Sequence, residues 1–262
     1  MPGQDPASHQ LVRDAIMPLT EKEHRIKGSG ELNEMFNALG RTAAGLQRDF
    51  GEVENLQSSI KGAADFVAKA IARIEGMILS DLQLIRPQAA ITTTGGHIPG
   101  DGMDEFVLGF SGAGNFVRGN PHFAVSLALK HEGETVIGLV YSPMDDRLYF
   151  AEKGRGAFIF SPFHSQRIRV SGRDALVDLT AYCDFANYKE LSGIPRENIR
   201  VSGCAALDMA FVAAAKTDIM ICAAPSLPEI AAGQLIVQEA NGVVDWKDGD
   251  LVAANLKLKD II

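Results

Sequence analysis

Two amphipathic segments open the regularly patterned part of the chain. From Glu31 to Phe50, apolar side chains recur every three or four residues, which is the spacing of one buried helix face. A second stripe with the same spacing runs from Phe66 to Leu82, and Pro87 follows it as a break signal. The pattern predicts two long helices, each packed by one face against a core.

A series of short apolar runs comes next, separated by turns that contain Gly, Pro or Asp. The runs cover residues 89–94, 106–110, 123–129, 135–141, 148–151, 157–160 and 167–170. In the strand-rich middle, with turns at 131–134, 143–146 and 153–156, the links are too short for crossover connections and predict an antiparallel meander.

Strand and helix patterns alternate after Ser171, which is typical of an α/β layer. Helices are expected over 205–216 and 229–240, and strands over 176–182, 218–223, 243–246 and 251–254. Together with the two long helices and the meander, these elements predict an α/β fold of stacked layers in one compact body.

The first thirty residues fit neither pattern. A short helix-like stretch at 9–16 ends before Pro18, and a Gly28-Ser29-Gly30 hinge follows. We expect an N-terminal extension over 1–30, either docked on a neighbour or frayed. One domain is then expected over 31–262, with helices and antiparallel sheet over 31–170 and the α/β layer over 171–262.

Composition and charge narrow the functional classes. The 262 residues are 46% hydrophobic and 22% charged, which excludes a disordered chain, and 33 acids against 25 bases give a net charge of −8. This charge repels a phosphate backbone and argues against nonspecific nucleic-acid binding. No run approaches the ~20 apolar residues that span a bilayer, and no signal-peptide core is visible. We expect a soluble, cytoplasmic protein without a membrane partner.

The three cysteines are Cys183, Cys204 and Cys222. Their odd number and wide spacing argue against a disulfide framework and against a zinc ribbon. We therefore expect reduced thiols packed in the interior.

A glycine-rich run at Gly109–Asn115 follows a predicted strand, but it matches no familiar catalytic motif. A dinucleotide-binding fingerprint would need glycine at position 117, where this chain has Val117. A P-loop would need lysine at position 115, where it has Asn115. A nucleophile elbow would need glycine at position 113, where this chain has Ala113. It would also need a catalytic histidine near the C-terminal end of the chain, but no histidine follows His164. The run is best interpreted as a strand-to-helix turn that needs small residues.

The same turn contains a candidate anion site. If the backbone amides of Gly112, Ala113, Gly114 and Asn115 open a helix, they are placed to hold phosphate or sulfate without a metal.

Five segments of the chain resemble one known family, in the order in which that family has them. The resemblance is to the inositol monophosphatase family, and within it to the bacterial extragenic-suppressor branch. It implies an αβαβα sandwich of the inositol monophosphatase and fructose-1,6-bisphosphatase type, and usually a homodimer. It also implies two or three Mg²⁺ ions, held by carboxylates, that activate water against a phosphate ester. The matching segments are 61–67, 115–129, 138–158, 205–214 and 231–244.

The chain departs from that family at the expected metal ligands. The family's Asp-Pro-x-Asp-Gly-Thr motif corresponds to 108–113 here, so Leu108 and Ser111 stand at two aspartate positions and Ala113 at the threonine. The family's glutamate pair falls on 92–94, where Thr93 and Thr94 carry no carboxylate.

Three further family positions concern the catalytic acid, the last metal ligand and the sugar contact. Ile71 takes the place of the acid in the Thr-Glu-Ala-Asp motif, and Cys222 that of the sugar-contacting glutamate. Glu229, in Pro228-Glu-Ile-Ala-Ala-Gly233, is the only acidic ligand position that is retained.

Small hard cations need several oxygen anions, so the sequence predicts no metal, no cofactor and no catalytic residue at these positions. The resulting hypothesis is a pseudoenzyme, a binding or scaffolding protein that forms a homodimer and has an unidentified protein partner. One alternative is a phosphoric monoester hydrolase with a rearranged Mg²⁺ site. The other is a metal-free sensor of phosphate or sulfate. Candidate ligands for the rearranged site are Glu229, Asp101, Asp104, Glu105 and Ser111.

Overall fold

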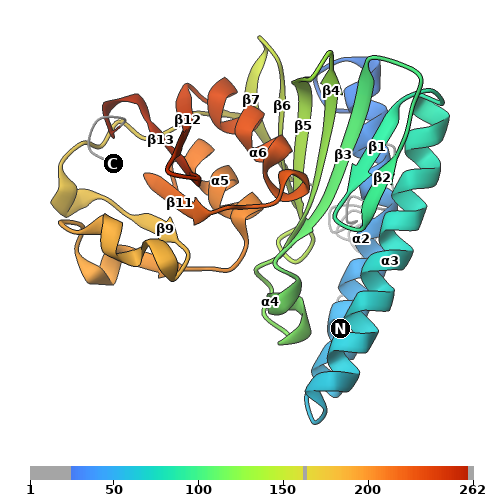
Figure 1. Ribbon diagram of the computed structural model, residues 1–262, viewed down its shortest axis with the longest axis horizontal. Helices are drawn as coiled ribbons and strands as arrows, with labels where there is room; N and C mark the ends of the chain where they lie inside the picture. The colour runs from blue at the N-terminus through green and yellow to red at the C-terminus, as the bar shows by residue number, and fades with distance from the viewer. Residues whose placement is uncertain (1–24, 162–163, 259–262) are drawn as a thin grey trace, which may run out of the picture.

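The computed structural model describes residues 25–161 and 164–258 as a stack of layers (Figure 1). A pair of long helices covers one face of an eight-stranded sheet, and two shorter helices cover the other face. A five-stranded sheet lies on the far side of the shorter helices, and short 3₁₀ turns flank it. The predicted layered α/β class is confirmed.

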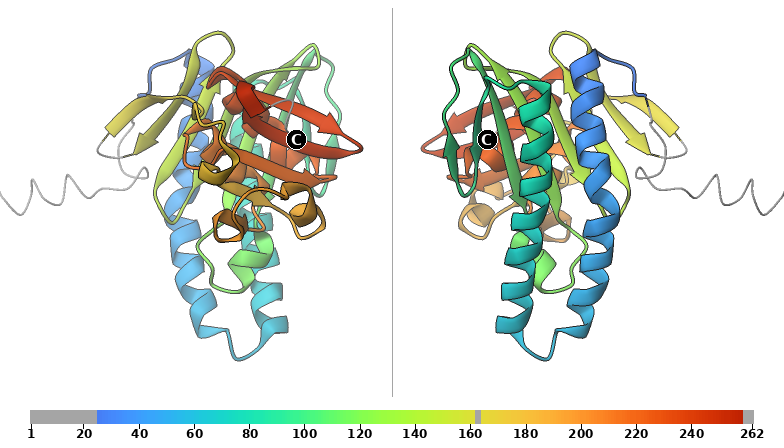
Figure 2. Two further views of the ribbon diagram at one scale, coloured as in Figure 1. Left: turned by 90° about the vertical axis from the view of Figure 1, so that its left-hand side faces the viewer. Right: turned by 90° about the vertical axis from the view of Figure 1, so that its right-hand side faces the viewer.

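The two long helices are α2 (Gly30–Asn55) and α3 (Ile60–Ile85), and both were predicted from their apolar stripes. They stand side by side and extend beyond the lower edge of the sheet (Figure 2). Serine caps begin both helices: Ser29 accepts a hydrogen bond from the amide of Leu32, and Ser59 accepts one from Gly62. These caps explain why each helix starts earlier than its apolar stripe alone indicates.

The large sheet has the order β2-β1-β3-β4-β5-β6-β7-β8. Strand β1 pairs in parallel with β3, whereas all other neighbours in this sheet are antiparallel. The meander predicted from the short links is thus present from β3 to β8. Its strands are β1 (Ala90–Thr93), β2 (Gly96–Ile98), β3 (Asp104–Ser111), β4 (Ala124–His131), β5 (Glu134–Ser142), β6 (Arg147–Glu152), β7 (Gly156–Ser161) and β8 (His164–Ile168).

The second half contains helices α5 (Ala205–Ala213) and α6 (Leu227–Glu239) and a sheet of order β10-β9-β11-β13-β12. The strand expected over 176–182 is shorter than predicted. A 3₁₀ turn takes up Leu176–Asp178, and the buried Asp218 carboxylate binds the amide of Thr180 just before the strand begins. The strands are β9 (Ala181–Cys183), β10 (Ile199–Val201), β11 (Ile219–Ala223), β12 (Gly242–Lys247) and β13 (Asp250–Asn255).

The chain joins the packed body before residue 30. Ile26 is buried in the core, and the side chain of Asn33 binds both its amide and its carbonyl. The amide of Ser29 donates to Glu152 on β6. The helix-like stretch predicted at 9–16 lies outside the described residues.

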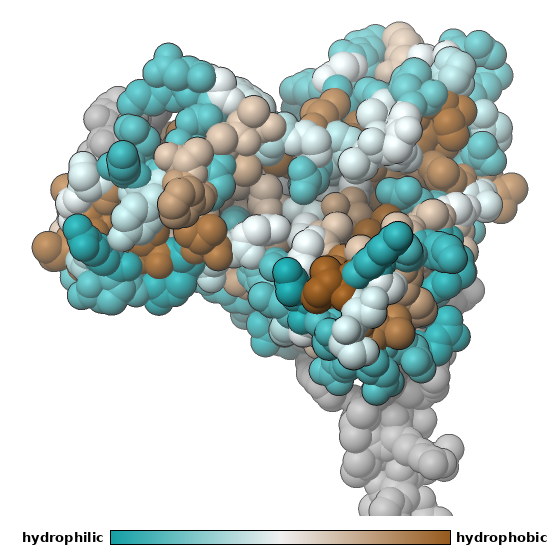
Figure 3. All heavy atoms as spheres, turned by 60° about the horizontal axis from the view of Figure 1, so that its bottom comes forward, coloured by the Kyte–Doolittle hydropathy of each residue, from teal (hydrophilic) through white to brown (hydrophobic). Residues whose placement is uncertain are grey.

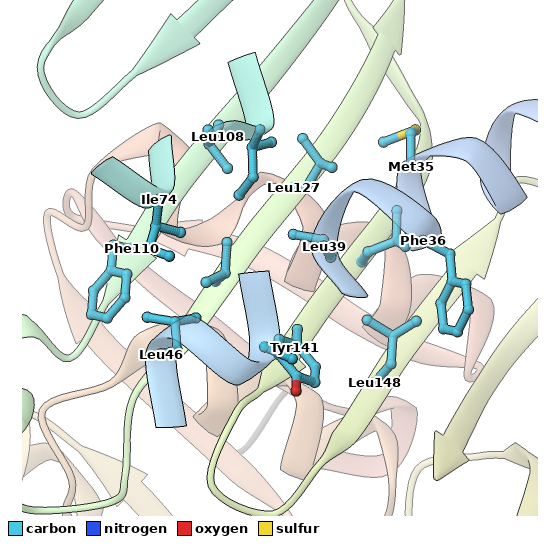
Figure 4. Packing of buried hydrophobic residues seen from close by; sticks show 14 of the residues in the cluster. Met35, Phe36, Leu39, Leu46, Ile74, Leu108, Phe110, Leu127, Tyr141 and Leu148 are labelled. Atoms are coloured by element: carbon cyan, nitrogen blue, oxygen red, sulfur yellow. The ribbon is translucent and has the colours of Figure 1, made fainter. Parts of the chain in front are cut away.

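The largest core cluster lies between the long helices and the sheet (Figure 4). Leu39 and Leu46 of α2 and Ile74 of α3 face Leu108 and Leu127 of the sheet. The lower end of the molecule carries scattered apolar side chains among polar ones (Figure 3). No helix within the described ranges has the length and apolar character needed to cross a membrane.

Helix α6 approaches the large sheet at two glycines. A Cβ atom at Gly109 would lie 2.3 Å from the carbonyl oxygen of Pro228, and one at Gly138 would lie 2.7 Å from that of Ala232. Both distances are below any normal contact, so glycine is required for α6 to pack directly on β3 and β5.

We expect Gly109→Ala to destabilise the protein by about 1–3 kcal/mol, because the added methyl group must push α6 from the sheet. For a chain of this size, that cost lowers the melting temperature by roughly 2–10 °C. Gly76→Ala is the matched control, because Gly76 is an exposed α3 residue with open space at its Cβ position. A Gly109→Ala protein as stable as the wild type would contradict this packing.

Candidate functional site

A cleft of about 420 Å³ lies where the first turns of α5 and α6 meet the ends of β9 and β11. Its wall combines carboxylates, thiols and small residues that leave backbone accessible. The lining residues are Cys183, Asp184, Val201, Gly203, Cys204, Ala205, Asp208, Ile221, Cys222, Ala223, Ala224, Pro225, Ser226 and Glu229.

Two helix N-termini open onto this cleft. Cys204 is the N-cap of α5 and Ser226 is the N-cap of α6, and both line the cavity. The first turn of a helix has amides without intrahelical partners and carries the positive end of the helix dipole. The cleft therefore offers partial positive charge and donors suited to an anion.

Glu229 sits in the first turn of α6, and two serines fix its carboxylate. The Ser111 hydroxyl donates to Oε1 at 3.2 Å, and the Ser226 hydroxyl donates to Oε2 at 2.8 Å. Ser111 also accepts a hydrogen bond from the amide of Ala206 at 3.4 Å. Ser111 thereby ties the end of β3 to the starts of α5 and α6, and it orients Glu229.

Two more carboxylates line the cleft, and both have partners. Asp184 accepts hydrogen bonds from the amides of Asn187 and Ala223. Asp208 accepts one from the Ser202 hydroxyl at 2.5 Å, and its other oxygen lies 3.4 Å from Nε2 of His122. Burial raises the pKa of Asp208 despite these partners, which favours its protonated form more than in water.

The cleft brings together all three cysteines, although the sequence places them far apart. Cys183 and Cys222 come from the adjacent strands β9 and β11, and Cys204 precedes α5. Burial raises the pKa of Cys183 to about 11 and that of Cys204 and Cys222 to about 12. All three are free, and they are protonated at neutral pH; Cys183 and Cys204 are buried as predicted, whereas Cys222 is only half-buried. Their convergence could not be foreseen from spacing.

The other positions expected to replace metal ligands lie outside the cleft. Leu108 is 1% exposed and belongs to the core under α2 and α3 (Figure 4). Ile71 packs against the same core. Thr93 pairs in register with Leu108, and Thr94 is exposed in the following turn. Ala113 also packs against that core.

Of the candidate ligands for a rearranged site, Ser111 meets Glu229, but the set as a whole does not converge. Asp104 pairs with Arg86 and His131, and Glu105 accepts a hydrogen bond from Thr92, away from Glu229. Within residues 25–161 and 164–258, no group of three or more His, Cys, Asp or Glu side chains is arranged to hold a metal ion. The residues present do not fit the family's Mg²⁺ ions, so no role is assigned to a metal here.

The glycine-rich turn is occupied by structural contacts. Gly112 has a φ of +85° and begins α4 (Ala113–Val117), a single helical turn. The Asn115 side chain donates to the carbonyls of His122 and Ser202 at 2.7 and 2.8 Å. The predicted anion site at Gly112, Ala113, Gly114 and Asn115 thus lies beside the cleft, outside its lining, and it stays a prediction.

Comparisons with known proteins identify the fold family. A protein-family model, described as "Inositol monophosphatase family", matches residues 31–258 of the sequence. This chain belongs to the inositol monophosphatase family. It is 37% identical over 235 residues to an inositol-1-monophosphatase of Mesorhizobium japonicum, covering 84% of this chain and 87% of that protein.

Other family members carry a different name. A Nus factor SuhB of Xylella fastidiosa is 29% identical over 253 residues, which are 87% of this chain and 90% of that protein. The crystal structure of extragenic suppressor protein suhB from Bartonella henselae superposes on this chain with a TM-score of 0.78 at 32% sequence identity. The match covers 89% of this chain and 97% of that protein. The family resemblance and its layered fold are therefore confirmed.

These relatives correct the functional hypothesis drawn from the sequence. The expectation of a pseudoenzyme acting as a binding or scaffolding protein is wrong, because relatives that are 36–38% identical over more than four fifths of this chain are named inositol-1-monophosphatases.

A substitution at Leu108 tests whether this position belongs to the apolar core or to a polar site. We expect Leu108→Asp to destabilise the protein by about 3 kcal/mol or more, because it buries a carboxylate among apolar side chains. Leu108→Met conserves volume and should cost less than about 1.5 kcal/mol. Denaturant unfolding with and without Mg²⁺ measures both. A Leu108→Asp protein that is more stable than the wild type would place the residue in a polar site instead.

Proposed function

We propose that this chain hydrolyses a phosphomonoester of a polyol in the cleft between α5 and α6. The observation that carries the proposal is the fixed Glu229 carboxylate at the mouth of two converging helix N-termini. The inositol-1-monophosphatases among the relatives support the reaction class and the polyol as the alcohol part of the substrate.

The helix N-termini supply the phosphate-binding groups. Among the residues that line the cleft there is no Lys, Arg or His. The dipoles of α5 and α6, with those first-turn amides that have no partner among the described residues, are therefore the available groups for an anion; the amides of Ala206 and Glu229 are already bonded. The phosphate is thus held chiefly by main-chain groups.

Glu229 is placed to act on the attacking water. Its two oxygens are held by Ser111 and Ser226, which leaves the carboxylate oriented beside the cleft. As the water oxygen bonds to phosphorus, Glu229 takes the water's proton and the ester P–O bond breaks. The alcohol oxygen is protonated from solvent, giving the free polyol and inorganic phosphate.

Release of inorganic phosphate from inositol, glycerol and sugar monophosphates tests this proposal, in Mg²⁺ and in EDTA side by side. We expect Glu229→Gln to lower kcat by about 100-fold or more, the usual effect of losing a general base. Glu52→Gln, an exposed carboxylate on α2, should leave kcat unchanged. Folded wild-type protein that releases no phosphate under either condition, or an unimpaired Glu229→Gln protein, would refute the proposal.

The assembly and location are proposed on the family resemblance. We propose a homodimer, since isologous pairs are the commonest closed assemblies. Light scattering after size exclusion should give twice the monomer mass; a monomer mass at micromolar concentration would refute it. Cytoplasmic location is proposed because the three cysteines are free, as in reducing compartments.

A further inference from the structure

We propose that Asn115 is a positioning residue for the phosphate group, because its side chain fixes the turn that leads into α5. Asn115 thereby sets the affinity of the cleft for phosphate without touching the phosphate itself. This proposal rests on the proposed phosphate site at the N-terminus of α5, but it does not require that the chain hydrolyses an ester. A polar residue of the glycine-rich run thus has a role far from its own place in the sequence.

The side-chain amide of Asn115 bridges two turns that are distant in the sequence. Its Nδ2 donates to the carbonyl oxygen of His122 at 2.7 Å and to that of Ser202 at 2.8 Å. His122 precedes β4 of the large sheet, and Ser202 lies between β10 and α5. An amide nitrogen has two hydrogens, so both are used, and Asn115 ties the large sheet to the start of α5.

A second bridge joins the same two residues through their side chains. One oxygen of the Asp208 carboxylate accepts a hydrogen bond from the Ser202 hydroxyl at 2.5 Å, and the other oxygen lies 3.4 Å from Nε2 of His122. The Ser202 hydroxyl also accepts one at 3.1 Å from the amide of Cys204, the N-cap of α5. The four residues of the two bridges form a clasp, made of Asn115, His122, Ser202 and Asp208.

The clasp holds the part of the cleft wall that presents backbone amides. Gly203 and Ala205 line the cleft, and within the described residues their amides have no hydrogen-bond partner. Gly203 has a φ of +74°, and a Cβ atom there would lie 3.6 Å from Nδ2 of Asn115. Asn115 therefore packs directly against this turn. A shift of the turn would move the free amides away from the position in which they meet a phosphate.

Glu229 is held by different groups. The Ser111 hydroxyl at the end of β3 and the Ser226 hydroxyl at the start of α6 bind its carboxylate. No hydrogen bond joins Glu229 to a clasp residue within the described part of the chain. Loss of the Asn115 bridge is therefore expected to weaken phosphate binding while the carboxylate that acts on water stays in place.

The bridge needs an amide at this position. An aspartate side chain has the same shape, but its carboxylate has no hydrogens and would face two carbonyl oxygens. Polar groups that lose their partner away from water are costly, so the turn before α5 would shift to relieve them. Position 115 thus acts through hydrogen bonds to main-chain carbonyls, whereas a P-loop lysine at this position would act through its charge.

Calorimetric titration of the full chain with inorganic phosphate tests the proposal. We expect Asn115→Asp to weaken phosphate binding at least fivefold at a temperature where the variant is folded. Asn120→Asp is the matched control and should change the affinity less than twofold. Asn120 is exposed in the same loop, and its Oδ1 accepts a bond from the His122 amide at 3.0 Å, which an aspartate retains. Equal affinities of the two variants, or no phosphate binding by the wild type at millimolar concentrations, would overturn the proposal.

Ser202→Ala tests the clasp without a change at Asn115. It removes the hydroxyl that links Asp208 to Cys204, so it should also weaken phosphate binding. In the double variant with Asn115→Asp, the loss should be smaller than the product of the two single losses, because both bridges hold the same turn. A lowered melting temperature with unchanged phosphate affinity in Ser202→Ala would show a purely structural role and overturn the proposal.

Steady-state kinetics with inositol monophosphate separates binding from turnover. In Asn115→Asp we expect KM to rise at least fivefold with kcat within twofold of the wild type, the opposite of the effect expected for Glu229→Gln. A loss confined to kcat would overturn the positioning role. Wild-type protein that binds phosphate but hydrolyses no ester would refute the hydrolase activity, and the calorimetric comparison of the variants would still decide on the clasp.

Discussion

The direct contact between α6 and the large sheet is the constraint on which the rest of the molecule depends. Helix α6 lies between two sheets and is apolar around most of its surface, so it must be covered on both sides. Gly109 and Gly138 let its backbone approach the strands without intervening side chains. The same contact brings the first turn of α6 against the end of β3, where Ser111 meets Glu229. The position of the cleft thus follows from the packing of one helix.

The amino-acid pattern predicts the first half of the fold better than the second. Helices α2 and α3 and the meander have long, regular stripes or short links, and these local signals leave few alternatives. Strands β9 and β10 have three residues each, too few for periodicity to be visible. Their pairing depends on contacts with β11, far along the chain, which local patterns do not contain.

The candidate site likewise depends on contacts between distant parts of the chain, which local sequence patterns do not contain. The family resemblance singled out Ser111 and Glu229 separately, and the structure joins them across 118 positions of sequence. The meeting of three cysteines in one cleft, and the roles of Asp184 and Asp208 in its wall, depend on strand order and helix placement. The burial of Leu108 likewise depends on how the layer of long helices packs on the sheet. A motif alignment compares residues position by position and contains no information on this packing.

The two outermost strands of the large sheet have a consequence for how the protein behaves at high concentration. An outer strand exposes backbone groups to which another chain can add itself as a further strand. Here β2 has only three residues, all exposed, and β8 is mostly polar, with His164, Gln166 and Arg167 among its five residues. Short or hydrophilic borders of this kind are poor templates for fibrous growth, so the sheet can stay open at both sides without recruiting other chains.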